Sequence, residues 1–172
     1  MRRHCGGSMK MLWVFGVAAA IASAKLLMAE PASHRSITPK EAHELVYTML
    51  NADGWTKLRD FHLDKARTVQ ESPGFYAVYG GYYNPSGSGL IGDYAVEKTT
   101  GEVWYWNICA RLTSPALLKA QHALRKRTGL TDADYQTLQR PGPSCESGEE
   151  PQILQLGRPT LEGATNPNKG QR

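Results

Sequence analysis

Residues Gly87 to Gly92 read GSGLIG and match G-x-G-x-x-G, the pattern of a loop that cradles the pyrophosphate of a dinucleotide. Such a loop follows a buried strand and opens a helix, whose N-terminal amides face the phosphate. Here DYAVEK follows Gly92, and its alternation with period two predicts another strand. We therefore expect no bound nucleotide. The glycines would serve a hairpin, with Gly92 at a β-bulge or a close backbone approach.

Three carboxylates, Asp93, Glu97 and Glu102, lie near a second predicted hairpin, whose turn is at Lys98 to Gly101. Paired carboxylates can act as acid and base in hydrolysis. However, Asp93 and Glu97 fall on one face of their strand, while apolar residues occupy the other. We expect a polar, solvent-exposed face opposite a core face. A small exported hydrolase using Asp93 or Glu97 is the catalytic alternative.

Histidine and cysteine spacing favours neither a metal site nor cysteine catalysis. The chain has no H-E-x-x-H motif and no C-x-x-C pair, so we expect no metal and no cofactor. Cys109 and His122 are near enough in sequence to form a nucleophile and its base. A disulfide between Cys109 and Cys145 would make that thiol inert, and the sequence favours the disulfide.

The N-terminus has the composition of an export signal. Arg2, Arg3 and Lys10 precede an uncharged, largely apolar run from Met11 to Ala24, which ends in small residues. We expect cleavage after Ala24 or Ala29. The alternative is an uncleaved anchor, although a run of this length is shorter than the ~20 residues that span a bilayer. Loss of residues 1–24 lowers the formal charge from +4 to +1, so nothing suggests nucleic-acid binding.

Export also explains the cysteines. Cys5 leaves with the signal, and the two that remain, Cys109 and Cys145, are 36 positions apart. In an oxidising compartment they most simply form one disulfide. We therefore expect a periplasmic or secreted protein.

The sequence patterns predict one α+β domain at residues 37–145. A leader at 30–36 precedes this domain, and a disordered tail at 146–172 follows it. Thr38 and Glu41 form a capping box, and an apolar stripe follows to Leu50. The segments FYAVYGGYY, LIGDYAVEK and GEVWYWNICARL read as antiparallel strands. Helical patterns then follow from Ser114. The expected fold is an N-terminal helix packed on a three- to four-stranded antiparallel β-meander, followed by one or two C-terminal helices.

Aromatic residues are concentrated in this meander, and the third strand is apolar on both faces. One helix can cover only one face of a sheet. We expect the second helix to cover the other, with a dimer contact or a binding surface as alternatives. Tyrosine and tryptophan are favoured at binding surfaces. The predicted surface comprises Tyr82, Tyr83, Asn84, Trp104 and Trp106, with the loop from Asn84 to Gly89.

Two short motifs carry a resemblance to known families. The run Lys40 to Ala42 and the turn Thr100 to Val103 resemble those of PepSY-type and cystatin-like α+β modules of exported bacterial proteins. The resemblance spans Thr38 to Trp106, and the same outline resembles NTF2-like immunity proteins, which neutralise toxins by binding. The helical segment from Ser114 to Leu138 and the cysteine pair depart from both patterns. The resemblance implies binding or inhibition, and no catalytic residue carries over.

The sequence therefore predicts an exported, non-catalytic protein-binding module of the inhibitor or immunity type. Its partner would be a protein of the envelope or the exterior, with no nucleotide or nucleic acid, and membrane contact only through an uncleaved signal. The hydrolase and a structural envelope protein are the alternatives.

Overall fold

The first helix begins where the sequence predicts. The computed structural model describes residues 34–84 and 87–159, so the predicted signal peptide and most of the leader lie outside the described residues. Helix α1 spans Pro39–Ala52. The Thr38 hydroxyl accepts a hydrogen bond from the Glu41 amide, and the Glu41 carboxylate accepts one from the Thr38 amide at 2.7 Å, which completes the capping box. The predicted stripe is buried, at Ala42, Leu45, Val46, Met49 and Leu50.

One mixed sheet contains all the described strands, and it is larger than predicted. Its strands are β1 (His62–Leu63), β2 (Arg67–Thr68), β3 (Phe75–Asn84), β4 (Gly87–Glu97), β5 (Val103–Tyr105), β6 (Ala110–Leu112) and β7 (Gln152–Leu154). The order is β1-β3-β4-β5-β6-β7, and β2 also pairs with β3. Only β6 and β7 are parallel. The α+β class is confirmed, but seven strands replace the expected three or four.

The third predicted strand is broken into β5 and β6. The chain bends between Trp106 and Cys109, and β6 then pairs antiparallel with β5, with Trp104 opposite Arg111. Asn107, a residue that tolerates turns, lies in the bend and its side-chain amide donates to Asp93 at 3.2 Å. The prediction that GEVWYWNICARL forms one continuous strand is therefore wrong.

The C-terminal segment is also corrected. The sequence predicted disorder from residue 146, yet Gln152–Leu154 forms β7, which lies beside β6. Leu154 and Leu156 pack against the main core, and the Trp55 indole donates to the Gly157 carbonyl at 2.9 Å. These few apolar residues are too sparse to give a periodic signal, so the polar composition around them concealed the strand.

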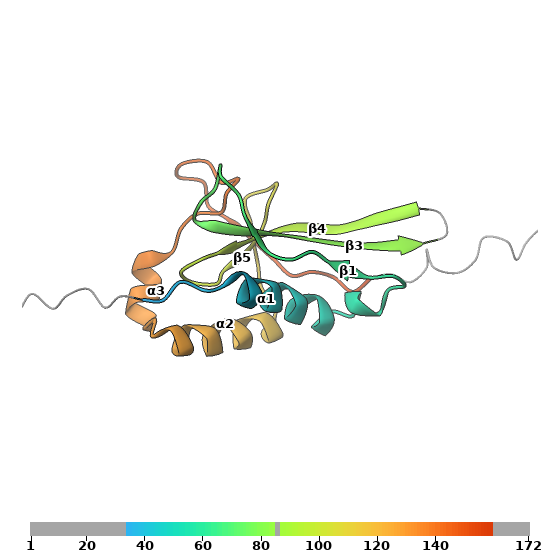
Figure 1. The fold of residues 1–172 in the computed structure, drawn as a ribbon. Helices are drawn as coiled ribbons and strands as arrows, with labels where there is room; N and C mark the ends of the chain where they lie inside the picture. The colour runs from blue at the N-terminus through green and yellow to red at the C-terminus, as the bar shows by residue number, and fades with distance from the viewer. Residues whose placement is uncertain (1–33, 85–86, 160–172) are drawn as a thin grey trace, which may run out of the picture. The chain divides into compact units, whose positions relative to one another are not determined.

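Both long helices lie on the same face of the sheet (Figure 1). After the 3-10 helix η1 (Trp55–Lys57), the remaining helices are α2 (Pro115–Thr128) and α3 (Asp132–Leu138). Leu117 and Leu124 of α2 join the core cluster that contains Leu45 and Met49 of α1. Helix α2 therefore packs beside α1, and the prediction that it covers the second sheet face is wrong.

The sheet thus has two unlike faces. On the helix face, Tyr76, Val78, Tyr94, Val96 and Val103 are buried in the main core with the two helices. The face turned away from the helices is called the open face here. By strand alternation and pairing it carries Phe75, Ala77 and Tyr79 of β3, Asp93, Ala95 and Glu97 of β4, Trp104 of β5 and Arg111 of β6.

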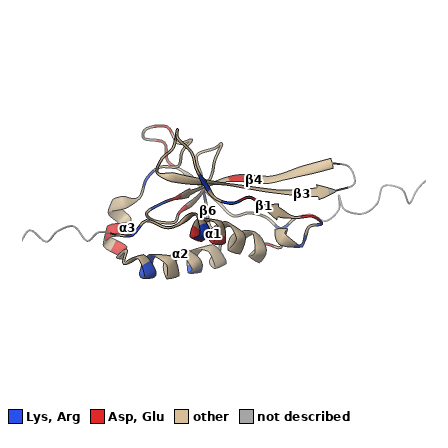
Figure 2. Cartoon of the chain, in the orientation of Figure 1, with Lys and Arg blue, Asp and Glu red and all other residues tan. Residues whose placement is uncertain are grey.

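Charges suit the helix ends (Figure 2). Arg125, Lys126 and Arg127 lie in the last turn of α2, and Asp132 and Asp134 lie in the first turn of α3. Each sign is favourable for the helix dipole at that position. Among the described residues, no helix has both the length and the apolar character needed to cross a membrane.

Glu41 connects three segments that are far apart in sequence. Its carboxylate accepts hydrogen bonds from Arg35 at 2.7 Å and from Arg127 of α2 at 3.0 Å, in addition to its bond from Thr38. Partial burial disfavours the charged carboxylate, but these hydrogen bonds outweigh it and hold the pKa of Glu41 at about 2. The ionised carboxylate therefore stabilises the α1–α2 layer.

We predict that Glu41→Gln removes part of the acid sensitivity of the fold. A carboxyl whose pKa falls on folding stabilises the native state above its ordinary value of 4.5, and this contribution is lost as the pH falls towards 2. Urea unfolding between these pH values should show a shallower loss of stability for Glu41→Gln than for the wild type. Glu44→Gln is the control, because that side chain is 56 % exposed. Equal slopes for Glu41→Gln and wild type would contradict the assignment.

Candidate protein-binding surface

One part of the open face is covered by a loop. Phe75, Ala95 and Trp104 form a second buried cluster, against which Trp106 and Cys145 pack. Gly142 is buried over the Trp104 ring, because a Cβ atom there would lie 2.5 Å from a ring carbon. The Pro-Gly-Pro sequence therefore allows the loop after α3 to approach the indole closely. Trp104, predicted as part of the binding surface, belongs to this core instead.

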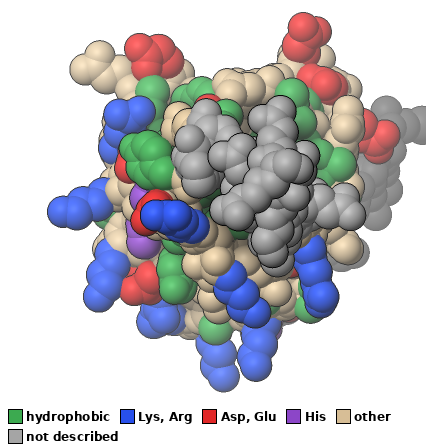
Figure 3. Space-filling view, turned by 90° about the vertical axis from the view of Figure 1, so that its right-hand side faces the viewer, with side chains coloured by type: hydrophobic (Ala, Val, Ile, Leu, Met, Phe, Trp, Pro, Cys, Tyr) green, Lys and Arg blue, Asp and Glu red, His purple; other side chains and the backbone are tan. Residues whose placement is uncertain are grey.

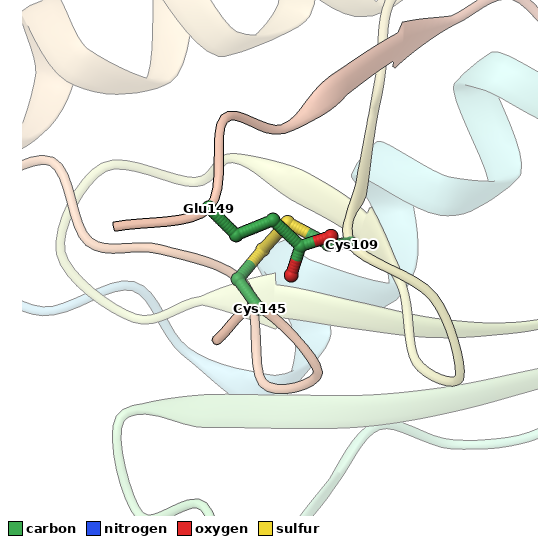
Figure 4. Close-up of side chains that lie close together, drawn as sticks. All are labelled: Cys109, Cys145 and Glu149. Carbon is green, nitrogen blue, oxygen red and sulfur yellow. A yellow bond between two sulfur atoms is a disulfide. The ribbon is translucent and has the colours of Figure 1, made fainter. Parts of the chain in front are cut away.

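The predicted disulfide fastens that loop. Cys109, directly before β6, is bonded to Cys145 (Figure 4). The Ser144 hydroxyl donates to the Trp106 carbonyl beside it. Glu149 brings a carboxylate oxygen within 4.8 Å of both sulfur atoms. Because metal ligation by cysteine requires a thiolate, this cluster offers no such ligand while the disulfide is intact.

The three predicted carboxylates have different surroundings. One oxygen of Glu97 accepts hydrogen bonds from the Thr99 amide at 2.9 Å and from the Thr100 amide and hydroxyl. Glu97 is only 1 % exposed, so it stabilises the β4–β5 turn and does not face solvent. The prediction that the Asp93 face is polar and solvent-exposed is wrong at this end of the strand, where buried Ala95 separates the two acids.

Glu102 has a different structural role. One of its oxygens accepts hydrogen bonds from Arg111 and from the Tyr135 hydroxyl, each at 2.6 Å. Burial, together with this hydrogen bond to Glu102, raises the pKa of Tyr135 to about 12. The Arg125 guanidinium lies 4.2 Å from the centre of the Tyr135 ring. These contacts hold α3 against the sheet.

The rest of the open face contains a groove of about 240 Å³. Ala77 and Tyr79 of β3, with Asp93 of β4, form its floor, and Trp106 contributes to its lining. The β1–β2 segment forms another side through Asp64, Lys65, Arg67 and Val69. Acidic, basic and aromatic residues therefore all line the groove, a mixture that is also found at protein interfaces.

An aromatic stack continues from the groove along the β3–β4 hairpin. The His62 ring lies 5.1 Å from that of Tyr83 and 6.0 Å from that of Tyr79. Tyr83 is 55 % exposed, and Leu90 across the hairpin is 57 % exposed. We call His62, Tyr79, Tyr83 and Trp106 the aromatic patch. Its members lie on one sheet face, although they come from β1, from β3 and from the bend that follows β5.

The other predicted binding residues have different positions. Tyr82 points to the helix face, where it packs against the main core and closely covers Gly89. Asn84 is the last residue of β3, and the loop residues Pro85 and Ser86 lie outside the described residues. The sequence did not predict His62 and Tyr79 as binding residues. The β1 segment has no clear periodicity, and only the β1–β3 register brings the two side chains together.

The glycine motif serves the hairpin, as predicted. Gly87 to Gly92 all belong to β4, and no helix follows them. The β3–β4 register shifts between Gly80 and Gly81, where Ile91 is the extra residue. A Cβ atom on Gly92 would lie 3.0 Å from the Tyr105 ring. Of the two alternatives predicted for Gly92, the close approach occurs at Gly92 itself and the bulge at the neighbouring Ile91. Gly87 and Gly89 were predicted in the hairpin loop but belong to β4.

The hairpin end of the molecule has a mixed surface (Figure 3). Hydrophobic side chains are interspersed there with polar ones, and lysine and arginine side chains gather along the left and lower rim. Apolar contacts bordered by polar groups are typical of protein interfaces.

Comparison with known proteins identifies no family. No family model matches the chain, and no curated protein is significantly similar to it. The resemblance to PepSY-type and cystatin-like modules thus has no counterpart in the comparisons. One similar solved structure is described as a type VI secretion system effector-immunity complex from Pseudomonas protegens. Its matching chain is 25% identical, with 63% of this chain and 91% of that chain covered and a TM-score of 0.49. A score below 0.5 establishes neither a shared fold nor a shared partner.

We predict that removing the disulfide destabilises the domain strongly. For a separation of 36 residues, chain entropy gives a loss of about 3 to 4 kcal/mol in the free energy of unfolding for the Cys109→Ser, Cys145→Ser double variant. Urea unfolding measures this loss. Reduced wild-type protein should match the double variant, and a variant as stable as the oxidised wild type would contradict the role of the disulfide.

Proposed function

We propose that this chain is a non-catalytic protein-binding module of the inhibitor or immunity type, exported to the envelope or the exterior. The observation that carries the proposal is the aromatic patch beside the groove on the open face. Aromatic rings provide large contact areas with little loss of side-chain entropy, and they dominate the energetics of many protein interfaces. The partner is accordingly a protein.

The location proposed for the protein rests on its cysteines and its N-terminal sequence. A structural disulfide persists in oxidising compartments and is rare in the cytosol. The basic and apolar segment that precedes residue 25 agrees with export.

The hydrolase alternative has less support. Glu97 is buried and its hydrogen-bonded oxygen serves the β4–β5 turn, so this carboxylate does not reach a substrate. Asp93 would have to act without it. Its nearest described side-chain partner is the amide of Asn107, which neither supplies nor removes a proton at ordinary pH. Binding therefore accounts for the open face better than catalysis does.

Alanine substitution on the patch tests the proposal. The oxidised protein would be immobilised and exposed to envelope and secreted proteins of the source organism, and the captured partner then purified for calorimetry. Tyr83→Ala and Trp106→Ala should each weaken binding about tenfold or more, which is the effect expected of an interface anchor. Tyr47→Ala is the matched control, because Tyr47 is an exposed tyrosine on α1.

The outcomes separate the three functions. Tyr83→Ala binding like the wild type, or Tyr47→Ala weakening binding equally, would contradict the patch. An enzymatic activity lost in Asp93→Asn would favour the hydrolase. Failure of any soluble partner to bind the wild type would favour a structural envelope protein.

A further inference from the structure

The outer half of β4 has a partner strand on one side only. Strand β3 pairs with β4 from Gly87 to Glu97, except at the bulged residue Ile91. On the other side, β5 pairs only with Tyr94 to Val96, and the bond from the Trp106 amide to the Asp93 carbonyl at 2.8 Å extends this contact by one residue. Within the described part of the chain, the backbone edge from Gly87 to Gly92 has no neighbouring strand. Figure 1 shows this part of the hairpin extending beyond β5 and the helices.

The outer part of the β3–β4 hairpin also has no described neighbouring strand on its β3 side. Strand β1 reaches only as far as the pair of His62 with Gly81, and β3 continues through Tyr82 and Tyr83. The described hairpin beyond this pair is therefore a two-stranded ribbon. Such ribbons are marginally stable in water, and a third strand or a packed face is needed to stabilise them.

From Gly87 to Leu90 this edge lacks the usual protection against pairing. Proteins protect exposed edges with charged residues, proline, bulges or very short strands. The other edge strands of this sheet are two or three residues long. By contrast, Gly87 to Gly92 has no charge and no proline, and Leu90 on it is 57 % exposed. The extra residue of the bulge, Ile91, lies at the inner end, so Gly87 to Leu90 keeps a regular register with β3.

We infer that the free edge of β4 from Gly87 to Gly92 pairs antiparallel with the same edge of a second copy of this chain. The two hairpins would then form a continuous four-stranded sheet. A strand edge is self-complementary about a two-fold axis, because each copy offers the same row of amides and carbonyls. The segment has no charged side chain, so the pairing places no like charges opposite each other. In the register with the two-fold axis at residue 90, the two exposed Leu90 side chains would lie opposite each other.

A second copy fits this edge better than a charged partner does. No side chain between Gly87 and Gly92 can form an ion pair with a charged partner, whereas an uncharged copy needs no ion pair. The contact uses the backbone edge of β4, while the aromatic patch lies on a face and is built mainly from β1 and β3. The inference of a dimer does not rest on the proposed function, and the two can be tested separately.

Sedimentation of the oxidised protein, without any partner, tests the inference. The wild type should change from monomer to dimer as its concentration rises. Leu90→Lys should remain monomeric, because the two introduced charges would meet at the edge. Leu118→Lys is the matched control and should dimerise like the wild type, since Leu118 is a similarly exposed leucine on α2.

Amide hydrogen exchange identifies the contact. The amides of Gly87 to Gly92 should become more protected as the concentration rises, while those of α2 should not. A wild type that stays monomeric up to about 1 mM would overturn the inference. So would a dimer that Leu90→Lys leaves intact, or one in which these amides gain no protection. Partner capture by Leu90→Lys, measured separately, shows whether the aromatic patch still functions.

Discussion

A sheet that is apolar on both faces must have both faces covered, and in this protein both long helices pack on one face. The Trp104 indole on the other face is covered by a loop with little secondary structure, anchored by the bond between Cys109 and Cys145. Gly142 allows the loop to reach the ring. A loop with few apolar residues gains little from burial alone, so a covalent tie compensates by restricting the unfolded chain.

This cover is partial, and its limit defines the candidate site. The loop protects Phe75, Ala95 and Trp104, while Tyr79 and Asp93 on the same face line an open groove. The ionisable groups that sequence reasoning associated with chemistry are engaged in structural contacts: Glu97 in a turn, and Glu102 with α3. The open face therefore offers shape, aromatic rings and mixed charge, and the proposed binding function rests on these features.

Local signals predicted local structure well. The Thr38–Glu41 capping box, the buried stripe of α1, the β3–β4 hairpin and the disulfide all follow from short-range patterns. What sequence reasoning missed depends on long-range pairing. No periodicity could show that α2 returns to the α1 side, that β7 joins β6, or that His62 lies beside Tyr83. Tryptophan spacing likewise could not separate buried Trp104 from Trp106, because only the loop that ends at Cys145 distinguishes them.

Oxidative labelling of the tryptophans in the native protein, measured by mass spectrometry, tests most directly whether the disulfide-bonded loop covers Trp104 and leaves Trp106 accessible. With the disulfide intact, Trp104 should be protected and Trp106 should be labelled. Reduction should release the loop and increase labelling of Trp104, with a smaller change at Trp55, which lies on the helix side. Equal labelling of Trp104 and Trp106 in the oxidised protein would contradict the division of the open face into a covered part and a binding part.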